Sequence, residues 1–341
     1  MIAHPIIGIL ALWCAARALG SLATALRQPA VIGELLAGAL FSPSFLGGHF
    51  RVQSPLMATA ALYSGIAFLF FAGFDIKLSS VMGRMKSGVA TAVAGAAVPF
   101  ALGYLFGTRY PTHFGFDGHS TLQTFGLFFG VSLAVSALPV IARTLMDVGL
   151  YRSPIGMVTM SAVIIDDVIG WVAFSTLVAT NLHDRPGAWK FHAPVAAYLI
   201  GLALREILRE RDLPAQEKLE WFANRVLSPL FFSVIGLKLG NVAQFDLGLT
   251  LSLIAIASVG KIFACAFVSR KTGMSSRDAW AVGFAMNSRG AMSVLLSSLS
   301  HELGIIGDRL FLALVIMALV TSMISGPALR RITKPSGMGW A

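Results

Sequence analysis

Charged side chains are scarce in this sequence. They account for 12% of its 341 residues, whereas hydrophobic residues account for 56%. A soluble domain usually carries about 25% charged residues, because its surface must face water. The shortage therefore argues against a soluble domain, and the 34 glycines fit helices in a bilayer, where glycine and proline are tolerated. We expect an all-α membrane protein.

Cysteine is the second shortage. The two cysteines, Cys14 and Cys265, both lie in apolar segments, so the sequence offers neither a disulfide framework nor a cysteine-based metal site. The first apolar segment also lacks a charged leader and a small-residue cleavage site, so we interpret it as a spanning helix and not as a signal peptide. We expect no cofactor and no enzymatic activity.

Positive charge, in contrast, is in excess, with a net charge of +10 at pH 7. In a soluble protein such an excess would suggest a nucleic-acid partner. Here the Lys and Arg residues lie in loops between apolar segments, where membrane topology explains them. We therefore expect the bilayer, and no nucleic acid, to be the partner of this surface.

Apolar segments long enough to span a bilayer recur along the whole chain. A spanning helix needs roughly 20 mostly apolar residues, and by that rule the sequence predicts eleven helices. Their ranges are 4–26, 29–47, 55–78, 84–107, 121–147, 153–180, 192–208, 219–239, 246–270, 277–300 and 307–330. We expect one transmembrane transporter domain over 1–341, without a soluble regulatory domain.

The loops after odd-numbered helices hold most of the Lys and Arg residues. The loop after the ninth helix contains Arg270, Lys271 and Arg277, for example, whereas the eighth helix is followed by Lys238 alone. Positively charged loops stay in the cytoplasm. We therefore expect the N-terminus outside and the C-terminus in the cytoplasm, in a multi-pass protein of the cell (inner) membrane.

Two helices five positions apart end in similar strings, LFFAGFDIKL (69–78) and LFFSVIGLKL (230–239). An odd offset places the two copies in opposite orientations, as in the inverted repeats of many transporters. The sequence thus predicts two inverted repeats, over about 29–180 and 192–331, in which the fifth helix corresponds to the tenth.

Asp166 and Asp167 are adjacent, half way along the sixth predicted helix, and Lys261 lies at the same depth in the ninth. An ionisable group inside a bilayer costs roughly 2.5–3.5 kcal/mol on insertion scales, so such groups usually serve a function. Two carboxylates and one ammonium near the midplane could exchange a cation for protons. The alternative is a buried salt bridge that only holds helices together.

The fifth and tenth predicted helices contain residues that interrupt a helix. Ser132, Ser136 and Pro139 lie near the centre of the fifth, and Asn287 and Arg289 lie near the centre of the tenth. Interrupted helices at equivalent places in two repeats point to a midplane ion site, because freed carbonyls can coordinate a cation. The alternative is a simple proline kink and a polar packing patch.

The sequence resembles the monovalent cation/proton antiporters of the sodium/proton exchanger type, in the branch with bacterial sodium/proton antiporters and potassium efflux systems. The resemblance covers nearly the whole chain, in the order of the family. Its strings are QPAVIGELLAGALFSPSFLG (28–47), FLFFAGFDIKL (68–78), SALPVIARTLMDVGLYRSPIG (136–156), SAVIIDDVIGW (161–171), GKIFACAFVSRKTGMSSRDAW (260–280), MNSRGAMSVLL (286–296) and LFLALVIMALVTSMISGPAL (310–329).

The resemblance implies an antiporter-like inverted-repeat bundle with two discontinuous helices and a dimerisation domain, so that a homodimer is expected. It also implies that Asp167 is the carboxylate that binds the ion and the proton. Asp166 matches an acidic position that pairs with a lysine in electrogenic members, and Lys261 matches that lysine.

Ser136 matches a position that is usually Thr in the first discontinuous helix of this family, and Asn287 and Arg289 match the second. Two features depart from the family pattern. Ser293 replaces an acidic residue expected after Arg289, and about two family helices are missing between Trp171 and the seventh predicted helix.

The sequence therefore favours a secondary active antiporter that exchanges Na⁺ or K⁺ for protons by alternating access. Asp167, Asp166, Ser136 and Ser132 are the expected ligands of the transient cation, and Lys261 is the counter-charge. Three other functions stay open. One is a membrane assembly or scaffold protein that keeps the fold without transport, and another is a proton or cation channel. The third is a symporter of a soluble substrate on a related fold, such as an organic-anion/sodium carrier.

Overall fold

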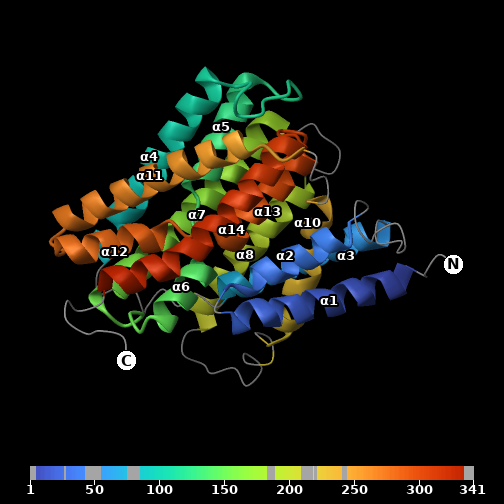
Figure 1. Ribbon diagram of the computed structural model, residues 1–341, viewed down its shortest axis with the longest axis horizontal. Coiled ribbons are helices and arrows are strands. Elements are labelled where there is room, and N and C mark those ends of the chain that lie inside the picture. The colour runs from blue at the N-terminus through green and yellow to red at the C-terminus, as the bar shows by residue number, and fades with distance from the viewer. Residues whose placement is uncertain are drawn as a thin grey trace. The chain divides into compact units, whose positions relative to one another are not determined.

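The computed structural model describes residues 5–26, 28–42, 55–74, 85–182, 189–208, 218, 221–239 and 244–333. Within these residues the regular structure is entirely helical (Figure 1). The helices are α1 (Pro5–Ala25), α2 (Ala30–Leu40), α3 (Pro55–Phe74), α4 (Met85–Arg109), α5 (Leu122–Ala134), α6 (Leu138–Asp147), α7 (Pro154–Leu182), α8 (Trp189–Leu208), the π-helical turn η2 (Ala223–Leu227), α10 (Ser228–Lys238), α11 (Leu247–Lys271), α12 (Ser276–Met286), α13 (Gly290–Glu302) and α14 (Asp308–Thr333).

The first of two compact units comprises Met1–Leu78 and Leu182–Phe245. In it α1 packs along α2, α2 along α10, and α3 along α8. Glycine allows the closest of these approaches. A Cβ on Gly38 of α2 would lie 1.9 Å from the carbonyl oxygen of Ser233 and 2.7 Å from the Cα of Gly236 in α10. The two helices therefore meet backbone to backbone, as small residues permit in membrane bundles.

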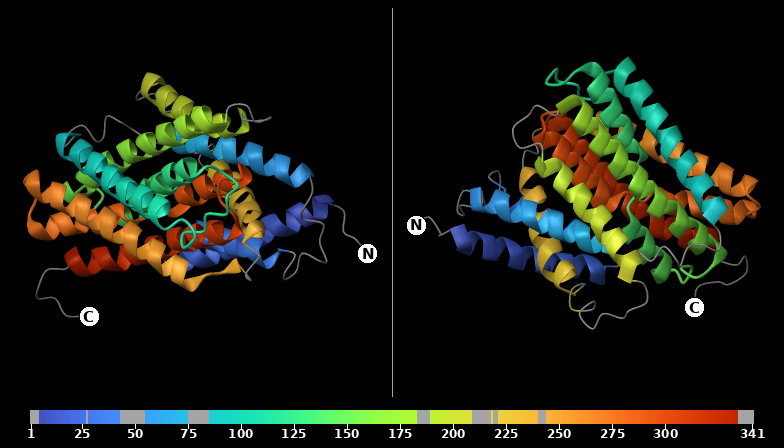
Figure 2. Two further views of the ribbon diagram at one scale, coloured as in Figure 1. Left: turned by 90° about the horizontal axis from the view of Figure 1, so that it is seen from above. Right: turned by 180° about the vertical axis from the view of Figure 1, so that it is seen from behind.

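The second unit comprises Ser79–Asn181 and Asp246–Ala341 and holds every candidate site residue. Here α4 packs against α5 and α11, α11 against α12, and α13 against α14 (Figure 2). Large side chains fill its interior, including Phe125, Phe128 and Phe129 of α5 and Trp171 of α7, each with less than 2% of its surface exposed.

In the second unit, two of the predicted spans each consist of two shorter helices. Between α5 and α6 the chain is extended, with ψ of 139° at Val135 and 101° at Ala137. Pro139 follows in the first turn of α6, where its missing N–H costs no hydrogen bond. Between α12 and α13 the chain passes through Asn287 and Arg289, which border the two helices.

Six segments of the described residues are long and apolar enough to cross a membrane, with α5 and α6 counted together. The all-α multi-pass fold is confirmed. The seventh predicted helix corresponds to α8, which begins three residues earlier than predicted, and the tenth is divided into α12 and α13. The predicted second and third helices run into 43–47 and 75–78, which lie outside the described residues. The π-helical turn η2 interrupts the eighth predicted helix, and no residue pattern had indicated it.

Candidate functional site

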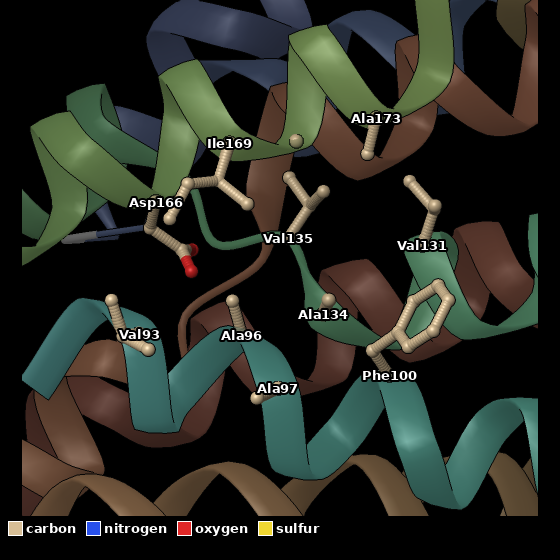
Figure 3. A pocket seen from close by; sticks show the side chains of 11 residues that line it. Val93, Ala96, Ala97, Phe100, Val131, Ala134, Val135, Asp166, Ile169 and Ala173 are labelled. Carbon is tan, nitrogen blue, oxygen red and sulfur yellow. The ribbon is translucent and has the colours of Figure 1, made fainter. Parts of the chain in front are cut away.

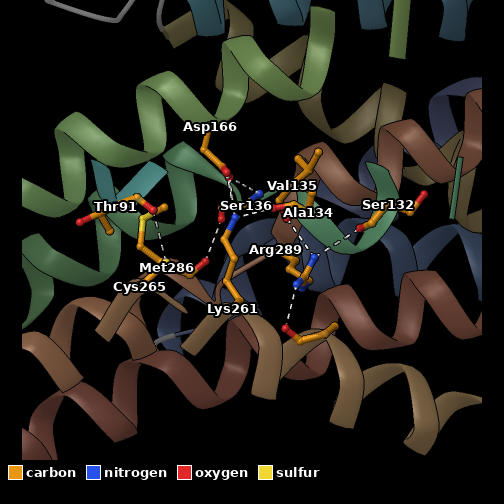
Figure 4. Close-up of polar contacts among 11 residues, drawn as sticks. Thr91, Ser132, Ala134, Val135, Ser136, Asp166, Lys261, Cys265, Met286 and Arg289 are labelled. Atoms are coloured by element: carbon orange, nitrogen blue, oxygen red, sulfur yellow. Dashed lines mark hydrogen bonds and ion pairs between the residues drawn. The ribbon is translucent and has the colours of Figure 1, made fainter. Parts of the chain in front are cut away.

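An ion pair between Asp166 of α7 and Lys261 of α11 is buried in the second unit (Figure 4). The Lys261 Nζ lies 2.9 Å from each carboxylate oxygen of Asp166. The same ammonium donates to the backbone carbonyl of Ala134, the last residue of α5. The backbone N–H of Ser136 donates to Asp166 Oδ2 at 2.9 Å. Two helices and the end of a third thus converge on one carboxylate.

The burial of this ion pair makes its two charges costly to separate. The side chains of Lys261 and Asp166 are 0% and 1% exposed. All three ammonium hydrogens have an acceptor, namely the two carboxylate oxygens and the Ala134 carbonyl. Removal of either partner would leave an uncompensated charge in a low-dielectric interior, which is strongly unfavourable. Any event that separates the pair must therefore supply a replacement charge.

Asp167 is buried as well, with 4% of its surface exposed. Successive residues of an α-helix point about 100° apart, so the two carboxylates of the pair address different neighbours. Of the two, Asp166 lines a cavity of about 210 Å³ between α4, α5 and α7 (Figure 3). The sequence predicted the pairing of Asp166 with Lys261, which the structure shows, and the transport role of Asp167 stays a prediction.

Hydrogen bonds connect the two chain interruptions directly. The backbone N–H of Ala137 donates to the Ser288 carbonyl at 2.9 Å, and the hydroxyl of Ser136 donates to the Met286 carbonyl at 2.8 Å. Helix ends leave backbone groups without intrahelical partners. Here each interruption satisfies groups of the other.

Arg289 places a fully buried positive charge beside the end of α5. Its Nη1 donates to the carbonyls of Ser132 at 3.3 Å and Val135 at 3.1 Å, and its Nη2 donates to the carbonyl of Ala257 at 3.2 Å. The C-terminal end of a helix carries partial negative charge on its free carbonyls. The guanidinium therefore neutralises the end of α5 next to the ion pair.

Several buried polar atoms here have no hydrogen-bond partner among the described residues. They are Ser132 Oγ, Asn287 Oδ1, Ser293 Oγ and Arg289 Nε. Such atoms are rare in proteins, and a bound water or ion is one explanation for them. Hydroxyl and amide oxygens are suitable ligands for a hard cation. The described residues contain no group of three or more His, Cys, Asp or Glu that could hold a resident metal.

Gly290 allows the two interruptions to approach. Its φ is +37°, and a Cβ there would lie 2.5 Å from Val140 Cγ2. Its N–H donates to Ser322 Oγ of α14 at 2.9 Å, and the Ser288 hydroxyl donates to the same oxygen at 3.4 Å. Ser322 was not predicted, because a lone serine in an apolar segment carries no distinguishing signal.

The structure thus brings together most of the predicted side chains. Asp166, Lys261 and Ser136 are in direct contact. Arg289 reaches the backbone of Ser132, although the Ser132 hydroxyl is not part of that contact. Pro139 lies in the first turn of α6, and none of the hydrogen bonds described above involves it. The backbone carbonyls that complete the network could not be assigned from side-chain identities.

The family described as "Sodium/hydrogen exchanger, transmembrane" has a model that matches residues 9–188 and 186–334. The chain belongs to this family. A solved structure, the sodium proton antiporter MjNhaP1 from Methanocaldococcus jannaschii, has the same fold, with a TM-score of 0.64 and 14% identity over 96% of this chain and 98% of that one.

Curated relatives are antiporters by name. The Na(+)/H(+) antiporter NhaS4 of Synechocystis sp. is 24% identical, with 93% of this chain and 94% of the relative covered. Cation/H(+) antiporter 15 of Arabidopsis thaliana is 26% identical, with 91% and 45% covered. The chain spans about half the length of this relative and of three further Arabidopsis antiporters.

The two parts of the family match meet at 186–188. The alignment with NhaS4 extends over 385 residues, which is longer than the 341-residue chain. Gaps in this chain are therefore required. The junction falls in the stretch after Trp171 where the sequence predicts the loss of family helices, and that loss stays a prediction.

Proposed function

We propose that this chain is a secondary active monovalent cation/proton antiporter in which Na⁺ or K⁺ and protons compete for Asp167. The observation that carries the proposal is the buried ion pair of Asp166 and Lys261, which stands beside Asp167 and beside two connected chain interruptions. Membership of the sodium/hydrogen exchanger family supports it. A carboxylate at this depth can hold either a proton or a small cation, but it cannot remain charged and alone.

Lys261 is the internal competitor in this scheme. In the cation-free state its ammonium neutralises Asp166. A cation that arrives at the aspartate pair brings a second positive charge, which weakens the attachment of Lys261 to Asp166. Departure of the cation restores the ion pair, and protons return to the site from the other side of the membrane. Alternating access requires that the site open to one side at a time.

The polar groups of the interruptions supply the remaining ligands. We assign the hydroxyls of Ser132 and Ser136 and the side-chain oxygen of Asn287 to the transient cation, because serine and amide oxygens suit hard monovalent ions. Arg289 keeps the carbonyl ends of α5 neutral and is not a ligand. Pro139 fixes the start of α6, so that Ser136 stays in the extended segment.

Membrane potential contributes to the driving force if the exchange moves net charge. Each elementary charge that crosses 100 mV gains or loses about 2.3 kcal/mol. The site holds three ionisable groups, Asp166, Asp167 and Lys261, so it has enough charges for unequal exchange. We propose electrogenic transport on this basis.

Topology and assembly follow the same proposal. We place the N-terminus outside and the C-terminus in the cytoplasm of the cell membrane, treat 29–180 and 192–331 as inverted repeats of one transporter domain, and expect a homodimer. Variants with a single introduced cysteine test both expectations in membranes. Crosslinking between two copies would report the dimer, and labelling of the cysteine from one side of the membrane or the other would report the orientation.

The test of function is flux in proteoliposomes that contain the full chain and an internal pH-sensitive dye. Addition of Na⁺, Li⁺ and K⁺ separately, at two pH values, should change internal pH with at least one cation and should identify the substrate. Current without obligatory exchange would favour a channel. The absence of any cation or proton flux in a well-folded sample would favour a scaffold protein and contradict the proposal.

A further inference from the structure

A cavity beside the ion pair serves no purpose in the exchange scheme. Its volume is about 210 Å³, and α4, α5 and α7 supply its walls. The walls are almost wholly apolar, with Val93, Ala97 and Phe100 from α4 and Val131 from α5 among them. Val93 is 52% exposed and Ala97 is exposed, so the α4 wall reaches the surface of the chain.

One charged side chain, Asp166, interrupts this apolar lining. Figure 3 shows the Asp166 carboxylate at one end of the cavity and Phe100 and Val131 at the other. Among the described residues, three hydrogen bonds reach the carboxylate, and one of them, from Lys261, is to Oδ1. A carboxylate oxygen has two lone pairs, so Oδ1 can accept a second donor without loss of the first.

The size of the cavity limits the ligand. An apolar cavity of about 150 Å³ is large enough to bind benzene. The cavity here can therefore hold one aromatic ring with a short substituent, and its walls exclude a second charged or strongly hydrated group, which would remain unpaired. An ammonium group on the substituent would meet the carboxylate, and the ring of Phe100 favours an aromatic neighbour.

We propose that this cavity binds a protonated aromatic monoamine of one ring, with its ammonium at Asp166 Oδ1 and its ring against Phe100 and Val131. The ligand ammonium is then a chemical copy of the Lys261 Nζ and reaches the same carboxylate from the side of α4. The two cations repel each other across Asp166. A bound amine therefore competes with Lys261, and removal of Lys261 strengthens its binding.

Binding is measured on the purified full chain in detergent, from the amine concentration that raises the thermal unfolding midpoint. Benzylamine is the probe, and benzyl alcohol is the neutral control of nearly the same shape. Four proteins are compared at pH 7: the unchanged chain, Lys261→Ala, Lys261→Ala with Asp166→Asn, and Ala173→Phe, which fills the cavity from α7. The readout is independent of transport, so it decides the ligand site whether or not the exchange proposal holds.

We expect benzylamine, but not benzyl alcohol, to raise the midpoint of the unchanged chain. Lys261→Ala should respond at about tenfold lower benzylamine concentration, because it removes the ammonium that competes for Asp166. When Asp166→Asn is added to Lys261→Ala, the tenfold gain in sensitivity to benzylamine should disappear. Ala173→Phe should raise the benzylamine concentration that is needed at least about tenfold. Stabilisation by benzyl alcohol equal to that by benzylamine would overturn the proposal. So would a double variant that responds to benzylamine as strongly as Lys261→Ala does. If Lys261→Ala does not fold, the unfolding midpoints of the unchanged chain and of Ala173→Phe, each with benzylamine and with benzyl alcohol, decide whether the cavity binds the amine.

Discussion

The backbone N–H of Ala137 donates to the carbonyl oxygen of Ser288 at 2.9 Å, so the interruption between α5 and α6 is bonded to the one between α12 and α13. Each segment has lost its helical hydrogen bonds, and buried backbone groups without partners are costly. The bond between them removes that cost for both. It also fixes Ser136, the residue before Ala137, whose N–H holds Asp166.

Gly290→Ala should destabilise the chain by more than its unusual backbone angle accounts for. The substitution adds a Cβ 2.5 Å from Val140 Cγ2 at a φ of +37°. A positive φ costs a non-glycine residue about 1–2 kcal/mol, and overpacking costs about 1–3 kcal/mol more. Thermal unfolding in detergent measures the loss.

The matched control for this prediction is Gly149→Ala. Gly149 also has a positive φ, +72°, but nothing lies within 4 Å of its Cβ position. It should lose only the backbone contribution. Similar midpoints for the two variants would show that the interruptions do not approach each other as closely as the structure places them.

Lys261→Met should be strongly destabilising, because it leaves the carboxylate of Asp166 buried without its counter-charge. The loss of one partner of a buried pair costs about 3–5 kcal/mol. The double variant Lys261→Met with Asp166→Leu should recover much of that loss, because an apolar pair has no charge to compensate. Unfolding of the single and double variants gives the coupling energy. A double variant that is no more stable than Lys261→Met would contradict a direct interaction.

Arg289→Lys should lower both stability and transport, although the charge is kept. The guanidinium donates to three backbone carbonyls from two of its nitrogens, and a lysine ammonium cannot reproduce that planar geometry. Arg143→Lys is the control, since Arg143 is 69% exposed and bonds to Asp147 one turn away on α6. We expect the control to stay within about 0.5 kcal/mol of the unchanged chain. Equal effects at the two positions would refute the structural role of Arg289.

Asp246, just before α11, makes stability depend on pH at the acidic end. Its side chain accepts a hydrogen bond from the Leu249 N–H at 2.8 Å and two more from Arg309, one of them at 3.0 Å. The Leu249 bond first, and the Arg309 bonds next, hold the pKa of Asp246 below its usual value of 3.8. A lowered folded-state pKa gives stability that is full above the unfolded value and is lost as the pH falls through the folded one.

Asp246→Asn isolates this contribution, because asparagine can still cap the helix but has no charge. The unfolding midpoint of the unchanged chain should exceed that of Asp246→Asn at pH 6. The difference should shrink as the pH falls below 3.8. A difference that persists undiminished at the lowest pH would mean that the charge of Asp246 is not its source.

The fold and the pairing of charges could be predicted from the sequence because each has a local signal. Apolar segments give the spans. A charged residue in such a segment is conspicuous, and so Asp166 and Lys261 stood out before any distance was known. Pro139 and the run Asn287–Arg289 likewise mark places where a helix ends.

The rest could not be predicted because it depends on backbone groups and on shape. No side-chain pattern shows that the carbonyl of Ala134 accepts from Lys261, or that Arg289 turns toward the end of α5. The cavity is formed by Val93, Phe100 and Val131, whose identities are ordinary for a membrane helix. The π-helical turn η2 gave no signal either.

The central claim is that Asp167 carries the exchanged ion and proton, and Asp167→Asn tests it most directly. The variant keeps the size and polarity of the side chain but cannot carry a charge or release a proton. In proteoliposomes loaded with a pH-sensitive dye, the unchanged chain should alkalinise or acidify the interior when its cation is added, and Asp167→Asn should not. Persistence of cation-dependent pH changes in a folded Asp167→Asn sample would contradict the account.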